Sequence, residues 1–471
     1  MKHFNLFASA KSGLYFLLFC QLIVSLFIIC QFDGIGYEGD SVMHYMYAKY
    51  SFHHPELFFN HWAKPVYVLL ASPFAQFGTN GIKWFNVLVM LLTAYFTFKT
   101  CAKLKFNNPL IGAVILIFSP LVFVLTFSGL TEPLFALVLI GSIYLLVSDK
   151  TVASSLLISF LPFVRTEGLF YLFIFAFYFL IAKKWKMLPL LLVGHVLYSI
   201  AGYFVYGNLL WVVNKIPYAR FSSNYGSGKL MHFVDQMIYV VGVPIYILFW
   251  IGVLATIIHA VRRQINIKFA VFIFMGFFTF FIAHTVFWYY GIFNSMGLKR
   301  VLICVAPLSS IIALAGYNFL LGFFQKKKTL LLIITILLLS YIVVFPFTPN
   351  RAAINWQKDM SLSADQQLAK QAALLVKTKA NSGARFFYTH PYLSESLMLD
   401  HFDTTKHLEL NTFYKKHIQS GDIIIWENWF SIVECGLTKE MLDKDTSIIN
   451  LHVLKAHDGN REVVYSIYQC K

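Results

Sequence analysis

The segment between Gly34 and Pro65 gathers acidic and basic side chains directly after the first long apolar run, Leu14–Phe32. Its ionisable residues include Glu38, Asp40, His44, His53, His54, Glu56, His61 and Lys64. The rest of residues 1–347 contains only five carboxylates. Charged groups close to hydrocarbon are costly and are usually kept for function. We therefore interpret this segment as part of a reaction site, although a polar connecting loop is the structural alternative.

A carboxylate surrounded by cations suits the transfer of a sugar from a phosphate carrier. The carboxylate would take the proton of the acceptor hydroxyl, and the cations would stabilise the phosphate as it leaves. A glycosidase would instead need two facing carboxylates in fixed roles. We predict Asp40 as the catalytic carboxylate, with Glu38 beside it. The predicted phosphate- and substrate-binding residues are His44, His61, Lys64, Glu132, Arg165, Glu167, Lys299 and Arg300.

The acidic residues also have structural interpretations. Asp40 is suited to cap a helix over 41–50, and Glu38 to be a solvated neighbour. Glu132 stands before Pro133, where a carboxylate commonly begins a helix. The sequence leaves these alternatives open.

The basic residues and histidines are equally open to a second interpretation. Arg165 can pair with Glu167 inside a broken helix, and Lys299 and Arg300 can be interfacial anchors. The four histidines of the first loop do not have the spacing of a zinc site. We expect the imidazoles of His44 and His61 to hydrogen-bond the acceptor. A divalent metal, Mg²⁺ or Mn²⁺, would have Asp40 as its ligand, and the sequence leaves metal use undecided.

The composition is that of a polytopic membrane protein. Hydrophobic residues make up 58% of the 471, and charged residues only 13%. Apolar runs predict an all-α membrane part, residues 1–347, with about eleven spans and a short apolar segment at 65–78 that lies along the interface or dips back. The predicted spans are 14–32, 84–98, 109–127, 133–148, 152–164, 169–182, 187–205, 237–260, 269–289, 301–323 and 329–347.

The distribution of charge orients the predicted spans. Residues 1–347 carry 24 Lys and Arg against 8 Asp and Glu, whereas residues 348–471 carry 14 of each. Clusters such as Lys326–Lys328 fall on one side, which the positive-inside rule makes cytoplasmic, so we do not assign the basic excess to nucleic-acid binding. Seven of the eight carboxylates, all but Asp149, fall on the other side with the first outer loop, 33–83. We expect a bacterial inner-membrane protein with a cytoplasmic N-terminus and an extracytoplasmic site.

Residues 348–471 read as a small extracytoplasmic α/β domain. Helical spacing predicts a helix at 363–379. Strands are expected at 384–389, 422–426, 448–454 and 462–468. An oxidising compartment would permit a disulfide between Cys435 and Cys470, and the sequence does not decide whether it forms.

Five short motifs occur in order along residues 1–320. They are Glu38-Gly39-Asp40, Lys64-Pro65, Leu130-Thr131-Glu132-Pro133-Leu134, Arg165-Thr166-Glu167-Gly168 and Gly297-Leu298-Lys299-Arg300. Together they resemble the GT-C superfamily of polytopic membrane glycosyltransferases, the group of protein O-mannosyltransferases and aminoarabinose transferases. The resemblance covers most of residues 1–320. It implies a GT-C fold and an inverting transfer from a polyprenyl-phosphate sugar on the extracytoplasmic side.

The resemblance also assigns roles to two residues of the first loop. Asp40 matches the acid proposed as base or metal ligand, and Lys64 matches the lysine that meets the donor phosphate. The aminoarabinose transferases have an acid before that lysine, whereas this chain has Ala63.

Two other functions remain as alternatives: a transporter or flippase of lipid-linked glycans, and a polymerase or ligase of such glycans. Transporters usually place ionisable groups near the bilayer midplane and contain internal repeats. Here the carboxylates lie at the outer helix ends, and no repeat is visible. The transferred sugar, and whether the acceptor is a glycan, a lipid or a protein, are not determined by the sequence.

Overall fold

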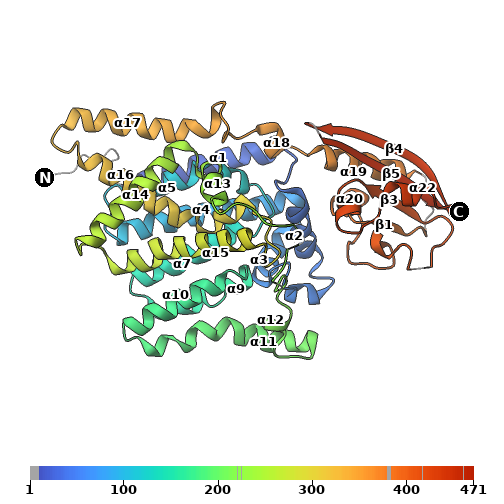
Figure 1. Cartoon of the computed structure of the whole chain (residues 1–471), viewed down its shortest axis with the longest axis horizontal. Coiled ribbons are helices and arrows are strands. Elements are labelled where there is room, and N and C mark those ends of the chain that lie inside the picture. Colours follow the sequence, from blue (N-terminus) through green and yellow to red (C-terminus); the bar gives the residue numbers. More distant parts are fainter. Residues whose placement is uncertain (1–9, 220, 224, 379–382, 416, 460) are drawn as a thin grey trace.

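The computed structural model describes residues 10–471 except 220, 224, 379–382, 416 and 460. Helices built from the apolar runs pack side by side, and a small sheet lies at one end of them (Figure 1). The buried core runs through the helical part and continues into the C-terminal region, where it includes Leu368, Tyr388 and Ile425.

Seven described helices are long and apolar enough to cross a membrane, which indicates an integral membrane protein. They are α1 (Ala10–Gln31), α4 (Gly78–Lys103), η2–η3–α11 (Trp185–Tyr206), α14 (Val243–Val261), η4–α15 (Phe269–Tyr290), η5–α16 (Lys299–Gly322) and α17–η6 (Lys328–Phe347).

The other predicted spans are shorter or broken helices. They are α5 (Leu110–Ile117), α6 (Pro120–Leu125), α7 (Glu132–Val147), α8 (Thr151–Ile158), α9 (Leu161–Val164) and α10 (Gly168–Ile181). The run predicted as one span at 109–127 breaks before Pro120, which has no N–H for a helical hydrogen bond. The run at 237–260 divides at Gly242, whose φ is +79°, into α13 (His232–Val241) and α14.

The first outer loop folds into α2 (Glu38–Tyr50), η1 (Pro55–Phe59) and α3 (Pro65–Ala75). The short apolar segment expected at 65–78 thus contains a helix, α3, most of whose residues are buried. Asp40 is the third residue of α2, and the N-cap position is held by Tyr37, whose side chain makes no capping hydrogen bond. The alternative in which Asp40 caps this helix is therefore wrong.

The C-terminal region contains a five-stranded mixed sheet of order β2-β1-β3-β5-β4. Strands β1 (Phe386–Tyr388), β2 (His407–Glu409) and β3 (Ile423–Glu427) are parallel, whereas β5 (Arg461–Cys470) runs antiparallel to both β3 and β4 (Ile448–Asp458). β2 was not expected from the sequence, because three residues leave too short a pattern. The helices of this region are α18 (Trp356–Met360), α19 (Ala364–Lys377), α20 (Tyr392–Leu397), α21 (Phe430–Val433) and α22 (Lys439–Asp443).

Two details of the C-terminal region bear on the sequence expectations. α19 begins with a capping box between Ser363 and Gln366, and it packs against β4 and β5. Cys435 and Cys470 are free thiols in this structure.

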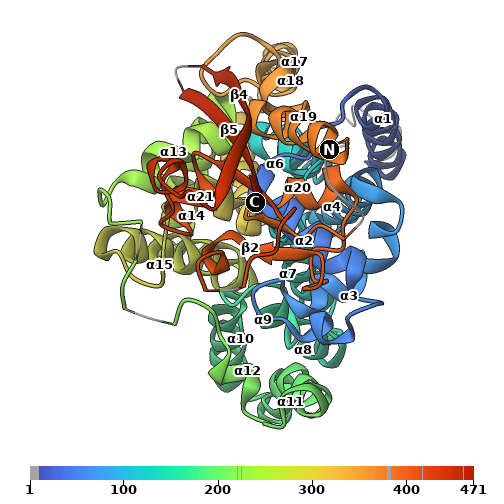
Figure 2. The same cartoon turned by 90° about the vertical axis from the view of Figure 1, so that its right-hand side faces the viewer.

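Helix α2 packs against both the helical part and the C-terminal region, and the end-on view shows it behind the C-terminal elements (Figure 2). Lys49 forms an ion pair with Glu395 at 2.9 Å, and the Tyr45 hydroxyl donates to the same carboxylate. His54, just beyond the helix, lies 2.9 Å from Asp400. These contacts fix the helix that carries Asp40 against both parts of the chain.

Candidate active site

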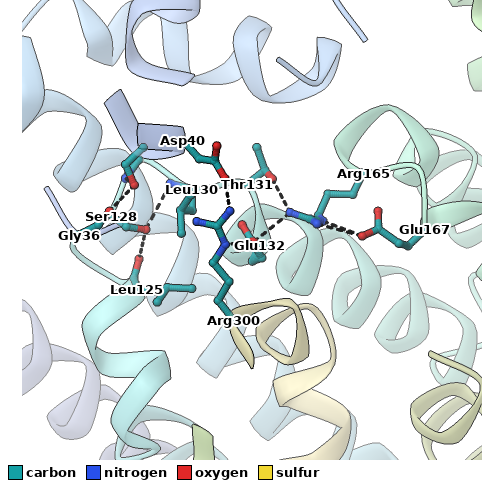
Figure 3. Close-up of polar contacts among 12 residues, drawn as sticks. Gly36, Asp40, Leu125, Ser128, Leu130, Thr131, Glu132, Arg165, Glu167 and Arg300 are labelled. Carbon is teal, nitrogen blue, oxygen red and sulfur yellow. Dashed lines mark hydrogen bonds and ion pairs between the residues drawn. The ribbon is translucent and has the colours of Figure 1, made fainter. Parts of the chain in front are cut away.

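Five of the predicted site residues form one continuous ion-pair network (Figure 3). Glu132 is 1% exposed and lies between two guanidinium groups: its Oε1 is 3.0 Å from Nη1 of Arg165 and 3.4 Å from Nε of Arg300. Arg165 also contacts Glu167 at 2.9 Å. Arg300 pairs in turn with Asp40. Residues 40, 132, 165, 167 and 300 are therefore brought together as expected.

Asp40 is the network member most open to solvent, with 43% of its side chain exposed. Desolvation raises the pKa of Asp40, but the charge and hydrogen bond of Arg300 outweigh it, so the pKa lies below its usual value. Arg300 also lies over the ring of Tyr37, 5.2 Å from its centroid. Asp40 is thus a carboxylate at neutral pH, held next to a fixed cation.

The start of α2 is held by hydrogen bonds to the loop that precedes Glu132. The Ser41 hydroxyl donates to the carbonyl of Gly36 and accepts from the N–H of Gly129 at 3.2 Å. A Cβ at Gly129 would overlap the Ser41 carbonyl, so the close approach requires glycine. Asp40 and Glu132 are therefore positioned by a single set of backbone contacts.

Two buried side chains hold the same loop from the other side. The Asn86 amide donates to the carbonyls of Ser128 at 2.6 Å and Leu130 at 3.1 Å, and the Tyr67 hydroxyl donates to Gly129 O at 2.7 Å. Buried carbonyls need such partners, because leaving them unsatisfied is costly. α3 and α4 thereby support the loop that ends at Glu132.

Lys64 differs from the two arginines, because no ion pair of its amino group is found among the described residues. Desolvation lowers its pKa to about 8, although the carboxylates of Glu167, Glu132 and Asp40 act in the opposite direction. Its φ of +69° is unusual for a non-glycine residue, a feature that is enriched at functional sites. Lys64 is therefore a cation near the network that is available to an anionic ligand.

The two histidines predicted to contact substrate lie beside this cluster. The His44 ring stacks on Trp62 with centroids 4.9 Å apart, and its buried Nδ1 has no hydrogen-bond partner. His61 is buried against Trp211, and its Nε2 is likewise without a partner. Desolvation lowers the pKa of His44 to about 3 and that of His61 to about 4, so both imidazoles are neutral.

One other predicted residue, Lys299, forms none of these ion pairs. Lys299 lies over the ring of Tyr239, 5.4 Å from the centroid. Glu38 is the first residue of α2, and its side chain lies outside the described part of the structure.

Three contacts of the network were missed by the sequence analysis. His284 on α15 places Nε2 3.6 Å from Glu167, Thr131 accepts from Arg165 at 3.2 Å, and Tyr37 lies beneath Arg300. His284 could have been found from the sequence, because a histidine inside an apolar run is costly and is usually kept for a functional contact. The other two had none, because their contacts come from distant parts of the chain.

The donor set around Asp40 does not fit a divalent metal. Arg300 is paired with its carboxylate, and Arg165 and Arg300 both contact Glu132. Among the described residues, no group of three or more His, Cys, Asp or Glu side chains is arranged to hold a metal ion. A divalent cation at Asp40 would be repelled by these guanidinium groups, so no metal takes part in the reaction proposed below.

Replacing the buried Glu132 with Gln is expected to destabilise the protein by about 3 kcal/mol, because it removes the buried carboxylate that the guanidiniums of Arg165 and Arg300 share. Thermal unfolding in detergent measures the effect. Glu56→Gln is the matched control, since that side chain is 56% exposed and its one ion pair among the described residues is with His54 at 3.8 Å. Equal unfolding temperatures for the two variants would contradict the role assigned to Glu132.

Comparison with known proteins identifies the fold. No protein-family model and no curated protein matches the chain. Among solved structures, it is similar to ArnT from Cupriavidus metallidurans bound to undecaprenyl phosphate, with a TM-score of 0.65 and 11% identity over 97% of this chain and 98% of that chain. This chain has the ArnT fold.

The apo state of the same ArnT gives a TM-score of 0.58 with the same identity and coverage. The predicted resemblance to the GT-C superfamily is thus confirmed for the fold. The likeness includes the C-terminal sheet as well as the helices, since it spans nearly the whole of both chains.

Proposed function

We propose that this protein is a membrane glycosyltransferase that moves a sugar from a polyprenyl-phosphate donor to an acceptor hydroxyl, with inversion at the anomeric carbon. One observation carries the proposal. The carboxylate of Asp40 belongs to an ion-pair network, and Lys64, which has no ion pair among the residues that the structure describes, lies near that network in a chain with the ArnT fold. The ArnT of known structure binds undecaprenyl phosphate.

The proposed reaction is a single displacement. The acceptor oxygen forms a bond to the anomeric carbon while the bond from that carbon to the phosphate oxygen breaks. Asp40 takes the acceptor proton, and Lys64 with the nearby guanidiniums stabilises the charge that develops on the phosphate. Because the leaving group is already a weak base, it needs no general acid.

The pairing of Asp40 with Arg300 has a consequence for this reaction. A carboxylate held by a guanidinium is a weak base, because its charged form is stabilised. When the donor phosphate shares Arg300, the hold on Asp40 weakens and its basicity increases. We therefore propose that donor binding prepares the base for the acceptor.

The topology in this proposal is the one inferred from the charge distribution. The membrane part is 1–347 with about eleven crossings, the shorter helices completing the set, and 348–471 is a separate extracytoplasmic domain. The N-terminus is cytoplasmic, and the first outer loop faces the extracytoplasmic side of a bacterial inner membrane. The acceptor is a glycan, a lipid or a protein of that compartment.

The test is mass spectrometry of glycolipids and glycoproteins from cells without this protein. We expect one sugar modification to disappear and to return with the wild-type chain, but not with Asp40→Asn. Unchanged glycans in the deleted cells would contradict the proposed transfer.

We expect the affinity for undecaprenyl phosphate to fall as the pH rises through about 8. The pKa of Lys64 is lowered to about 8, so its amino group is charged and attractive below that pH and neutral above it. Asp40, whose pKa is lowered, remains ionised over the same range and contributes no change. Binding titrations between about pH 6.5 and 9.5 measure the effect. Lys64→Arg should remove the decrease, because a guanidinium does not deprotonate. A decrease that survives in Lys64→Arg would assign the titration to another group.

A further inference from the structure

A cavity of about 1150 Å³ lies between the site and the C-terminal region. One side is formed by the start of α2, by residues within 296–300 before α16 and by Tyr225, and the other by residues within 351–367, 429–434 and 456–459 and by Arg461. The end-on view shows the C-terminal strands in front of α2 (Figure 2). The volume is that of a site for an extended ligand.

The cavity reaches the proposed base. Asp40 and Arg300 are among its lining residues, whereas Lys64 and Arg165 are not among the described residues that line it. Phe430 of α21 packs on the backbone next to Asp40, since a Cβ at Gly39 would lie 3.0 Å from its ring. Asp40 thus lies where the network meets this cavity, so a base at this position can serve a donor held by the network and an acceptor held in the cavity.

The charged side chains that line the cavity are balanced in number between cations and carboxylates. Its lining includes five cations and five carboxylates, and two opposite pairs are already in contact, Arg300 with Asp40 and Arg461 with Asp365. A polyanionic ligand would meet as many carboxylates as cations there. The charged lining residues are Lys299, Arg300, Arg351, Lys358, Arg461, Asp40, Asp359, Asp365, Glu434 and Asp458.

Aromatic side chains also line the cavity. Trp429 is 46% exposed and lines the cavity, and Arg461 lies over its ring, 5.3 Å from the centroid. Across from it, the Tyr225 hydroxyl is 3.5 Å from Glu434. An indole ring held in place by a guanidinium can pack on the C–H face of a pyranose. The carboxylates and basic side chains of the cavity can accept hydrogen bonds from, and donate them to, the hydroxyl groups of the sugar.

We propose that this cavity binds the acceptor, and that the acceptor is a saccharide without large net charge, for which Trp429 is the stacking surface. The proposal rests on the proposed function and names the substrate class of its second site. It assigns acceptor recognition to the C-terminal region, and donor recognition to the network around Lys64. A phosphorylated glycolipid head and a peptide are the competing acceptors.

The test uses the full chain in lipid nanodiscs and isothermal titration calorimetry. The probes are neutral oligosaccharides of glucose, mannose and N-acetylglucosamine, an oligogalacturonate, a Ser/Thr-rich peptide and undecaprenyl phosphate. We expect a neutral oligosaccharide to bind, Trp429→Ala to weaken it at least about tenfold, and Trp429→Phe to retain most of the affinity. Undecaprenyl phosphate should bind all three proteins equally.

Trp185→Ala is the matched control, since that ring is 59% exposed and does not line the cavity. It should leave every affinity unchanged. Binding of the oligogalacturonate or the peptide instead of neutral sugars, or neutral-sugar binding that is insensitive to Trp429, would overturn the proposal. Absence of any saccharide binding would also overturn it. If wild type fails to bind undecaprenyl phosphate, the proposed function fails. If it binds this lipid and no neutral sugar, only the acceptor proposal fails.

Discussion

Asp40→Asn is expected to lower the rate of sugar transfer by about 10²–10⁴-fold, the contribution of a positioned base. An amide cannot take the acceptor proton, whereas it has the volume of the carboxyl group and keeps an oxygen that can face Arg300. Because Asp40 is 43% exposed, the folded state should tolerate the change. The measurement is single-turnover transfer by purified protein, with unfolding temperature and affinity for undecaprenyl phosphate recorded in parallel.

Asp33→Asn is the matched control for this experiment. Asp33 precedes α2 and is 64% exposed; its carboxylate lies 3.5 Å from the Lys370 amino group and accepts a hydrogen bond from the Leu362 N–H at 3.4 Å. We expect wild-type transfer from this variant. Full activity of Asp40→Asn would remove Asp40 from the mechanism, and lost activity together with lost donor binding would make it a binding residue rather than the base.

Lys64→Met is expected to weaken binding of undecaprenyl phosphate by roughly 10–100-fold, the value of a hydrogen bond to a charged group. It should also slow transfer beyond the loss in binding, because the phosphate gains charge as the sugar leaves. Methionine has a similar length and no charge. Binding titrations and transfer at saturating donor separate the two effects.

Lys215→Met serves as the control, because Lys215 is exposed and lies over the ring of Tyr206, 4.7 Å from its centroid. Its loss should leave donor affinity unchanged. Equal weakening by both substitutions would reduce the role of Lys64 to general attraction between a basic protein and an anionic lipid. Unchanged affinity in Lys64→Met would move the phosphate to the guanidiniums.

The helix breaks show which features of the helices can be predicted from local sequence and which cannot. A long apolar run such as the one that forms α1 predicts a membrane-spanning helix from sequence alone. The transfer of its many apolar side chains out of water dominates the free energy of the segment. The break before Pro120 was readable from proline's missing N–H, yet the run was predicted as one span. The division at Gly242 depends on a backbone angle of +79°, which a glycine permits but does not require.

The sequence by itself determined the membrane class, and it concentrated the reactive residue types into a few short segments. This was possible because hydrophobicity and the scarcity of charge are local properties. Only the tertiary structure decided that Glu132 lies between the guanidiniums of Arg165 and Arg300, and that Trp429 forms a wall of the cavity that reaches Asp40. These residues are separated by up to several hundred positions, and their distances are set by how the helices and the sheet pack.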